Sequence, residues 1–213
     1  MQDRIDLSKG GLLTPAELGY YFPAEFAPQK AMWLSWPHKE ESWPGKIQTI
    51  YAPYAQFVKE VALGQEVHIN VADVAMQAFA KQQLELVGVR MDRIFFHFFP
   101  TNDAWCRDHG PAFLINPAAA IPKVLVKWNY NAWGEKYPPH DLDNQIPIHI
   151  AEALGIPYFL PGIVMEGGSV EFNGKGTLLT AARPATVETS AMSERCGTGQ
   201  VRLKSKPRVI GRP

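Results

Sequence analysis

The sequence predicts an α/β fold, because segments with helical periodicity alternate along it with short apolar runs typical of buried strands. Three times along the chain, an apolar residue followed by a glycine ends a helical pattern, and an apolar strand pattern comes next. The three pairs are Leu63-Gly64, Val87-Gly88 and Leu154-Gly155. This repetition favours repeated units of the ββαβ kind, although the spacing between the units is irregular. A chain of 213 residues is long enough for one domain with a sizeable core.

The chain begins with an irregular segment and then a first strand and helix. Residues 1–13 show little periodicity, and the first predicted strand, Met32–Trp36, ends at the Trp36-Pro37 step. Apolar residues recur at helical spacing from Ile47 onward, which predicts a helix. Gly64 is predicted to lie just past the end of that helix.

A second helix lies between two further predicted strands. Glu66–Val71 alternates as a strand does, and Asp73 is a candidate N-cap for a helix over Val74–Val87. Gly88 closes this helix, and Arg93–Phe99 is the next apolar strand. The pattern up to this point is strand, helix, strand, helix, strand.

A hairpin and a third helix are predicted in the second half of the chain. Ala112–Asn116 and Lys123–Trp128 read as short strands joined by a turn of a length that suits an antiparallel pair. A helix is predicted from about Asp143 to Leu154, with Pro147 near its first turn. Pro157–Leu160 begins another strand.

The composition excludes several classes of function. Charged residues make up 20 % and apolar residues 46 %, the formal net charge is zero, and no run approaches the roughly 18 apolar residues of a membrane span. The sequence therefore gives no reason to expect nucleic acid or a membrane as a partner, and without a secretory signal a cytoplasmic location is expected. Two cysteines, Cys106 and Cys196, exclude a disulfide framework and a multi-cysteine zinc site.

The last part of the chain differs in kind from the rest. Residues 181–213 contain seven Lys or Arg against two Glu, and they contain no Phe, Tyr or Trp. They also lack an amphipathic period. This compositional break predicts an atypical, disordered basic tail.

The stretch Asn102–Pro111, which reads NDAWCRDHGP, places two carboxylates, an aromatic ring and an arginine in one loop. It follows the apolar run Ile94–Phe99, and a proline prevents that strand from continuing, so the polar cluster starts where a strand ends. Ligands bind preferentially at the carboxyl ends of strands in open α/β folds, which predicts a site here. In the alternative interpretation Asp103 and Asp108 form turns, and Arg107 pairs with one of them inside the loop.

A second acidic loop, Met165–Ser169, reads MEGGS and again follows an apolar run. The glycine-rich stretch GGSVEFNGKG lacks the Lys-Ser/Thr ending of a phosphate-binding loop. It is better explained as a hairpin with its turn at Asn173-Gly174. Glu166 alone could equally be an ordinary solvated acid at the end of a strand.

Four stretches together resemble the agmatine deiminase family, which includes the bacterial-type peptidylarginine deiminases and belongs to the guanidino-group-modifying enzymes of the pentein fold. They are Trp33–Pro37 with Trp43-Pro44-Gly45, NDAWCRDHGP, WNYNAWGEKY from Trp128 to Tyr137, and MEGGSVEFNGKGTLLT from Met165 to Thr180. The resemblance covers about residues 12–180. It implies a pentein-type α/β propeller of five units around a central pocket, with residues 1–180 as the N-terminal half of the catalytic domain and residues 181–213 outside the family pattern.

The resemblance also implies roles for single residues. A guanidinium is planar, always charged and rich in donors, so it suits carboxylates in its plane that accept paired N–H bonds. The Asp of WxRD and the Glu of MEGGS bind the guanidinium in the family pattern, and these positions are Asp108 and Glu166 here. Trp105 matches the aromatic residue beside the substrate.

The implied reaction hydrolyses a guanidino group to a ureido group and ammonia. The substrate would be agmatine, giving N-carbamoylputrescine on the route to putrescine, or peptidyl or free arginine, giving citrulline. No cofactor is implied.

The family reaction needs a nucleophilic cysteine and a His-x-Asp element, and the sequence shows neither in the family's pattern. The chain as given is therefore expected to lack deiminase activity. Cys106 lies inside WxRD, and Arg107 could lower the pKa of its thiol, but Asp103 and Asp108 would oppose that effect.

Four other interpretations stay open on the sequence alone. The chain could be a non-catalytic guanidino-binding fragment, or a glycoside hydrolase that uses Asp108 and Glu166 as its carboxylate pair. The rings of WNYNAWGEKY could bind a cation or a sugar, or they could pack in the core. A metal site would require the fold to gather four separated side chains, namely His109, His140, Asp141 and Asp143.

Overall fold

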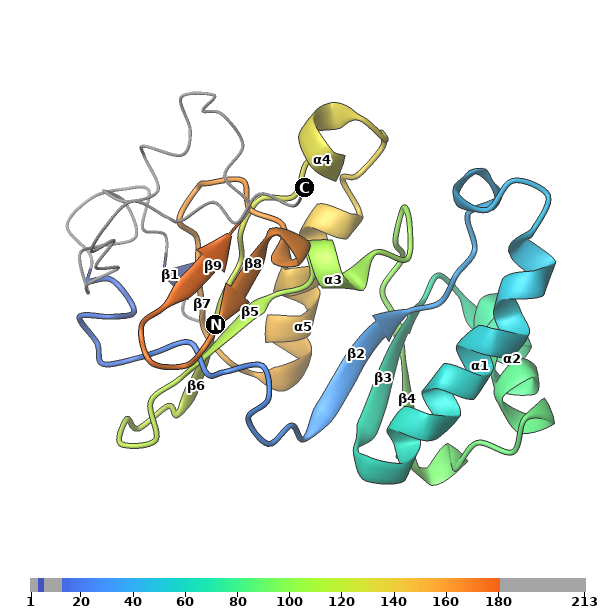
Figure 1. Ribbon diagram of the computed structural model, residues 1–213, viewed down its shortest axis with the longest axis horizontal. Helices are drawn as coiled ribbons and strands as arrows, with labels where there is room; N and C mark the ends of the chain where they lie inside the picture. Colours follow the sequence, from blue (N-terminus) through green and yellow to red (C-terminus); the bar gives the residue numbers. More distant parts are fainter. Residues whose placement is uncertain (1–3, 6–12, 181–213) are drawn as a thin grey trace, which may run out of the picture.

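The computed structural model describes residues 4–5 and 13–180. These residues form a three-stranded parallel sheet, a four-stranded mixed sheet and a two-stranded hairpin, with helices packed on the two larger sheets (Figure 1). The α/β class predicted from the sequence is confirmed. The tail predicted at 181–213 lies outside the described residues.

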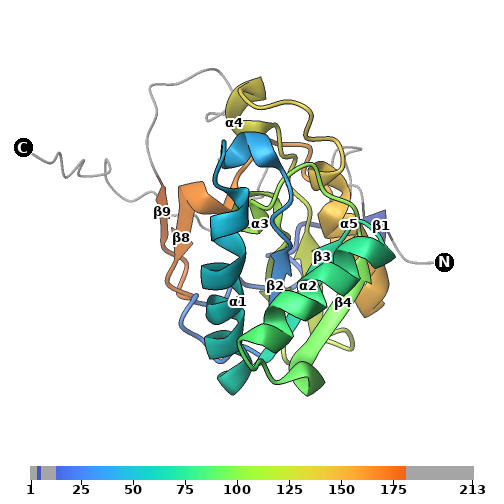
Figure 2. The same ribbon diagram turned by 90° about the vertical axis from the view of Figure 1, so that its right-hand side faces the viewer.

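The parallel sheet has the strand order β2-β3-β4, and all its strands run in one direction. The strands are β2 (Ala31–Ser35), β3 (Glu66–Val71) and β4 (Ile94–Phe98), connected by helices α1 (Ile47–Gly64) and α2 (Val74–Leu86). Both helices cover the same face of the sheet (Figures 1 and 2). This part of the chain is therefore a βαβαβ unit instead of the predicted ββαβ arrangement.

The core of this unit lies between the sheet and the two helices. Successive side chains of a strand point to opposite faces, so every second residue is directed at the helices. The buried side chains between sheet and helices include Leu34, Val67 and Ile69 of the strands, together with Ala55 and Val58 of α1. The opposite face carries Trp33, whose ring stacks on His68 at 4.6 Å and on His97 at 4.5 Å.

The mixed sheet has the strand order β1-β7-β6-β5. Strands β5 (Ala112–Ile115) and β6 (Lys123–Val126) form the predicted antiparallel hairpin. Helix α5 (Ile146–Leu154) then leads to β7 (Tyr158–Phe159), which is parallel to β6, and β1 (Arg4–Ile5) pairs with β7. The elements β5, β6, α5 and β7 constitute one ββαβ unit, as the repeated sequence pattern of helix end and strand predicted.

Helix α5 connects the two larger sheets. Ile146 and Ile150 of this helix pack with Leu125 of β6 in one buried cluster. Trp33 and Phe99, which belong to the parallel-sheet unit, pack against the same cluster. The helix is therefore part of the packing of both sheets.

The last described elements form a hairpin after a single 3-10 turn. The turn η5 (Gly167–Ser169) precedes β8 (Val170–Phe172), which pairs antiparallel with β9 (Leu178–Thr180). The side-chain oxygen of Asn173 accepts the backbone N–H groups of Lys175 and Thr177 at 2.9 and 3.1 Å. The predicted hairpin is confirmed, but its connection is the five-residue segment Asn173–Thr177 and not a two-residue turn at Asn173-Gly174.

Short helical turns occupy the connections between these elements. They are η2 (Glu40–Ser42), η3 (Met91–Arg93), α3 (Cys106–His109), α4 (Ala132–Glu135) and η4 (Asp143–Gln145). The stretch predicted as a loop from Asn102 to Pro111 thus contains one helical turn, and the third long helix begins at Ile146 after a 3-10 turn.

One sequence prediction needs correction, and another is not confirmed. Gly88 and Gly155 follow their helices with left-handed φ values of 73° and 64°, but Gly64 is the last residue of α1 and has no positive φ. Each of the three sheets is open, so the predicted propeller is not confirmed. Across residues 13–180, no helix combines the length and apolarity needed to cross a membrane.

Candidate functional site

The two acidic loops predicted from the sequence meet in the structure. The carboxylate of Asp108, on α3, accepts the backbone N–H of Gly168, in η5, at 3.0 Å. A Cβ atom at Gly167 would overlap the carbonyl oxygen of Arg107, and one at Gly168 would overlap the carboxylate of Asp108. Glycine permits such close backbone approaches. The glycine pair of MEGGS therefore allows the loop of Glu166 to lie against the loop of Asp108.

Glu166 is held by a strained turn of the chain. Its Oε1 accepts the backbone N–H of Trp133 at 3.0 Å. Around this donor the backbone is left-handed, with φ values of 49°, 58° and 63° at Ala132, Trp133 and Glu135. Such a conformation costs on the order of 1–3 kcal/mol for each non-glycine residue, so it persists only where surrounding contacts hold it. Asn131 supplies one of these contacts by accepting the N–H of Gly134 at 2.9 Å.

An aromatic group lies beside the acidic loops. Trp105 is 39 % exposed, stacks on Trp43 at 5.7 Å and meets Trp133 edge-on at 6.1 Å. Trp133 also meets Tyr130 and Tyr137 edge-on, at 5.9 and 5.7 Å. These rings form a wall next to Glu166, which binds the backbone of Trp133.

The WNYNAWGEKY segment divides between the two roles that the sequence left open. Trp128 packs in the core, where it contacts the cluster of β5 and β6 and the cluster that contains Met165. Trp133 instead belongs to the aromatic wall of the site.

Tyr130 lies in a strongly acidic environment. The residue is 4 % exposed, and burial raises the pKa of its hydroxyl. Four carboxylates raise this pKa further, in the order Asp143, Asp108, Glu166 and Asp103. Acidic groups from three separate segments therefore act on one point, and a cation bound there would be stabilised.

The carboxyl of Asp108 is influenced by opposing effects. Burial raises its pKa, whereas the N–H of Gly168 and the charge of Arg107 lower it. Burial is the largest of these effects, so the Asp108 pKa lies above its usual value. A bound cation would favour the ionised form.

Arg107 does not pair inside its own loop. Its guanidinium binds Glu25, and it reaches Glu171 at 3.1 Å on the surface of the hairpin. Asp103 instead accepts the hydroxyl of Ser42 and the N–H of Ala104. The alternative in which Arg107 neutralises Asp103 or Asp108 by a direct ion pair is not found.

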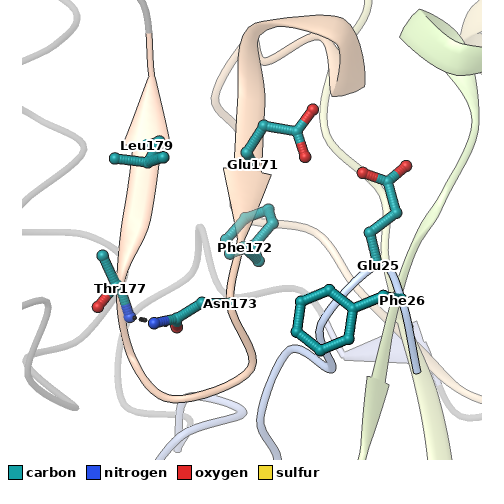
Figure 3. A pocket seen from close by; sticks show the side chains of 7 residues that line it. All are labelled: Glu25, Phe26, Glu171, Phe172, Asn173, Thr177 and Leu179. Carbon is teal, nitrogen blue, oxygen red and sulfur yellow. Dashed lines mark hydrogen bonds between the residues drawn. The ribbon is translucent and has the colours of Figure 1, made fainter.

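A cavity of about 500 Å³ lies on the outer side of this region, between the β8–β9 hairpin and the segment of Glu25 and Phe26 (Figure 3). Glu171 and Leu179 line its hairpin side. Neither Asp108 nor Glu166 lines it. The pocket predicted around those two carboxylates stays a prediction.

Cys106 has the properties of a structural residue. It packs against the core of the parallel-sheet unit, and burial raises the pKa of its thiol. Backbone hydrogen bonds at Ser35, Cys106 and Arg107 oppose this effect only in part, and Asp108 adds to it. A thiol in this environment is a poor nucleophile at neutral pH.

His109 is buried without a polar partner. It is 2 % exposed, neither ring nitrogen has a hydrogen-bond partner among residues 13–180, and burial lowers its pKa to about 4. The metal alternative gains no support, because within this part of the chain no three His, Cys, Asp or Glu side chains are arranged to hold a metal ion.

Sequence reasoning missed the residues that hold the site loops. Asp143 is 1 % exposed, and its Oδ1 accepts the N–H groups of Asn102 and Asp103 at 2.7 and 3.3 Å. The Oδ1 of Asn102 in turn accepts the N–H of Asp143 at 3.3 Å. Asn144 accepts the N–H of Tyr130 at 2.9 Å. In the sequence Asp143 marked a helix start and one ligand of a possible metal site, and nothing indicated that its partners would be backbone groups about 40 positions away.

Comparison with known proteins identifies the family. The family model described as Porphyromonas-type peptidyl-arginine deiminase matches residues 21–189. The chain belongs to this family. The match continues past residue 180, where the composition of the chain changes.

Relatives in this family agree in sequence and in fold. An agmatine deiminase of Pseudomonas savastanoi pv. phaseolicola is 34 % identical over 172 residues, which are 78 % of this chain and 45 % of the relative. The agmatine deiminase structure of Enterococcus faecalis has a TM-score of 0.71 and 29 % identity, over 84 % of this chain and 47 % of its own. An agmatine deiminase of C. jejuni, solved with substrate bound, has a TM-score of 0.64 and 26 % identity, over 76 % and 45 % of the two chains.

The chain thus spans about half the length of the relatives it matches. The likeness to deiminases supports guanidino chemistry and does not favour the glycoside hydrolase interpretation.

Proposed function

We propose that this chain binds the guanidinium group of a small substrate for a deiminase reaction, which hydrolyses the guanidino group to a ureido group and ammonia. Asp108 and Glu166 are the carboxylates that grip the group, and Trp105 lies beside it. The observation that carries the proposal is the contact between the two acidic loops, in which Gly168 donates its N–H to Asp108 only two residues after Glu166.

The chemistry of the site fits a guanidinium. The group offers N–H pairs on more than one edge, and each charge-assisted bond contributes about 1.5–3 kcal/mol net. Two carboxylates on different edges therefore select and orient the group. An adjacent aromatic face such as that of Trp105 adds a cation–π attraction of about 0.5–2 kcal/mol.

The acidic surroundings favour agmatine over free arginine as the substrate. Four carboxylates of the candidate site and its surroundings act on the hydroxyl of Tyr130. Arginine would bring both an ammonium and a carboxylate into this field, whereas agmatine brings an ammonium alone. Like charges repel and opposite charges attract, so the field discriminates between the two ligands.

The described residues bind and orient the guanidino carbon in this proposal, and the attacking group comes from outside them. Burial raises the pKa of the Cys106 thiol, so Cys106 does not serve as the nucleophile. A guanidino-binding module without catalysis is the alternative that the test below must separate from this function.

Calorimetric titration of the full chain with agmatine, arginine, putrescine and a chito-oligosaccharide tests the proposal. We expect agmatine to bind more tightly than arginine, and the oligosaccharide not to bind. Asp108→Asn and Glu166→Gln should each weaken agmatine binding about 10- to 100-fold, as expected when a charge-assisted bond is lost. Asp92→Asn is the control, because Asp92 is an exposed partner of Arg90 outside the site loops.

The comparison has clear contrary outcomes. If both site variants bind agmatine as tightly as the wild type, Asp108 and Glu166 do not bind the guanidinium group. A parallel assay of ammonia release separates the enzyme from the binding module.

A further inference from the structure

We propose that Asp143 and Asn144 are positioning residues that hold the two sides of the guanidinium site in one arrangement, each through a different site loop. The inference rests on the proposed function for its meaning, but its main test uses no ligand. The two residues are neighbours in η4, and their side chains reach different segments of the chain.

Asp143 holds the segment that leads into the Asp108 loop. Its Oδ1 accepts the backbone N–H of Asn102 at 2.7 Å and that of Asp103 at 3.3 Å. The side-chain oxygen of Asn102 accepts the N–H groups of Leu142 and Asp143 at 2.8 and 3.3 Å. The two segments therefore cap each other's backbone, and this fixes the direction in which the chain enters α3.

Asn144 holds the segment that leads into the strained turn. Its Oδ1 accepts the backbone N–H of Tyr130 at 2.9 Å and the amine of Lys127 at 2.8 Å. The Lys127 amine also donates to the side-chain oxygen of Asn129 at 2.7 Å. Tyr130 precedes the left-handed turn, in which the N–H of Trp133 binds Glu166. We call the contacts of Asp143 and those of Asn144 the two arms, so the Asn144 arm acts on the Glu166 side of the site.

Both arms begin on a rigid support. Helix α5 starts immediately after η4, and its Ile146 and Ile150 are each 1 % exposed in the cluster that joins the two larger sheets. A site is precise when its loops are tied to such an element instead of to one another. Asp143 itself is 1 % exposed and directed at backbone groups, so its effect on a substrate is indirect.

Hydrogen exchange of two backbone amides reads the two arms separately. The amide of Gly168 reports on the Asp108 side, and the amide of Trp133 reports on the Glu166 side. In the full chain, Asp143→Ala should raise exchange at Gly168 about tenfold, and Asn144→Ala should raise exchange at Trp133 by a similar factor, as expected for loss of roughly one hydrogen bond's free energy. Exchange at Ile69, in the core of β3, should not change in either variant.

A matched control comes from the same segment. Asp141 is exposed and reaches Asn102 only through a side-chain contact of 3.4 Å, so Asp141→Ala should leave both reporter amides unchanged. Equal acceleration at Ile69 and at the reporter amides would show a general stabilising role. No acceleration at the reporter amides would show that the two residues do not hold the site loops. Either result would overturn the proposal.

Conservative variants supply the rescue test. Asp143→Asn and Asn144→Asp keep an acceptor oxygen, and both should protect their reporter amides as the wild type does. Loss of protection in either folded variant contradicts the proposal. If Asp143→Ala does not fold, Asn102→Ala tests the same arm, because it removes the reciprocal acceptor and leaves the Asp143 carboxylate in place.

Agmatine titration tests the effect of the same variants on ligand binding. Asp143→Ala and Asn144→Ala should each weaken agmatine binding about tenfold, and the conservative variants should restore it. Wild-type protein that does not bind agmatine would refute the proposed function, and the exchange results would then decide the positioning role alone. Wild-type affinity in both folded alanine variants would overturn the positioning role.

Discussion

Gly168 donates its backbone N–H to the carboxylate of Asp108 at 3.0 Å, across 60 positions of the sequence. A Cβ atom at its neighbour Gly167 would overlap the carbonyl oxygen of Arg107, which belongs to the backbone and cannot turn away. The two glycines therefore do different things: Gly167 lets the two loops come together, and Gly168 orients a carboxylate.

Alanine substitutions should separate these two effects. Gly167→Ala forces backbone apart and should lower the free energy of unfolding by about 1–3 kcal/mol, the usual range for overpacking. Gly168→Ala meets a side chain that can rotate, so it should cost less stability but weaken agmatine binding at least tenfold. Urea unfolding and calorimetry measure the two quantities. Gly64→Ala is the control, since nothing lies within 4 Å of a Cβ there and its stability should not fall.

Asp143 should make stability depend on pH. Burial raises its pKa to about 6 from the usual 3.8, so the folded state binds the proton more strongly than the unfolded state. The stability from this group is present below about pH 3.8 and is lost as the pH rises to about 6, by up to about 3 kcal/mol. Asn at position 143 does not titrate, so the free energy of unfolding of Asp143→Asn should rise relative to that of the wild type between pH 4 and pH 7. Urea unfolding of both proteins at each pH checks this, and a constant difference would contradict it.

His109 should have the opposite pH dependence. Burial lowers its pKa to about 4 from 6.5, so its contribution is complete above pH 6.5 and is lost as the pH falls through about 4. At pH 5 the loss should be about 2 kcal/mol. His109→Phe keeps a ring against Tyr130 and removes two nitrogens that have no hydrogen-bond partner within residues 13–180. It should therefore reduce the loss of stability between pH 7 and pH 5. Thermal unfolding at both pH values compares the two proteins, and equal acid sensitivity would exclude His109 as its source.

Cys106 should react slowly with alkylating reagents in the folded protein. Burial raises the pKa of its thiol, and the thiolate is the reactive form. We expect iodoacetamide at pH 7.5 to modify Cys106 at least tenfold more slowly in buffer than in 8 M urea, as measured by mass spectrometry of the peptide that contains it. Equal rates would indicate an accessible thiolate and would restore Cys106 as a candidate nucleophile.

The sequence was most informative where local chemistry decides the structure. The apolar spacing from Ile47 onward predicts α1, and glycine at Gly88 and Gly155 marks helix ends because a left-handed residue is favoured there. Gly64 shows the limit of this argument, since the same dipeptide pattern continues the helix for one more residue. The strand positions of β5 and β6 followed from alternation and a short turn.

The site was only partly predictable, because its acids and its supports have different sequence signals. Asp108 and Glu166 occur in recognisable motifs, and the structure brings their loops into contact. Asp143 and Asn144 have no such signal, because short polar residues before a helix are common. The contacts that tie them to the site loops are with backbone groups, which every residue possesses. Contacts of a side chain with distant backbone leave no periodicity and no composition bias to detect.

Helix α5 also determines how the protein comes apart. Because it packs with Leu125 and with Trp33 in a single cluster, a fluctuation that undocks it exposes apolar surface on both large sheets at once. The parallel sheet keeps the core between its other face and helices α1 and α2, because no residue of α5 belongs to it. The site loops are tied to the start of α5, so we expect them to lose their arrangement in this local event, before the parallel sheet unfolds.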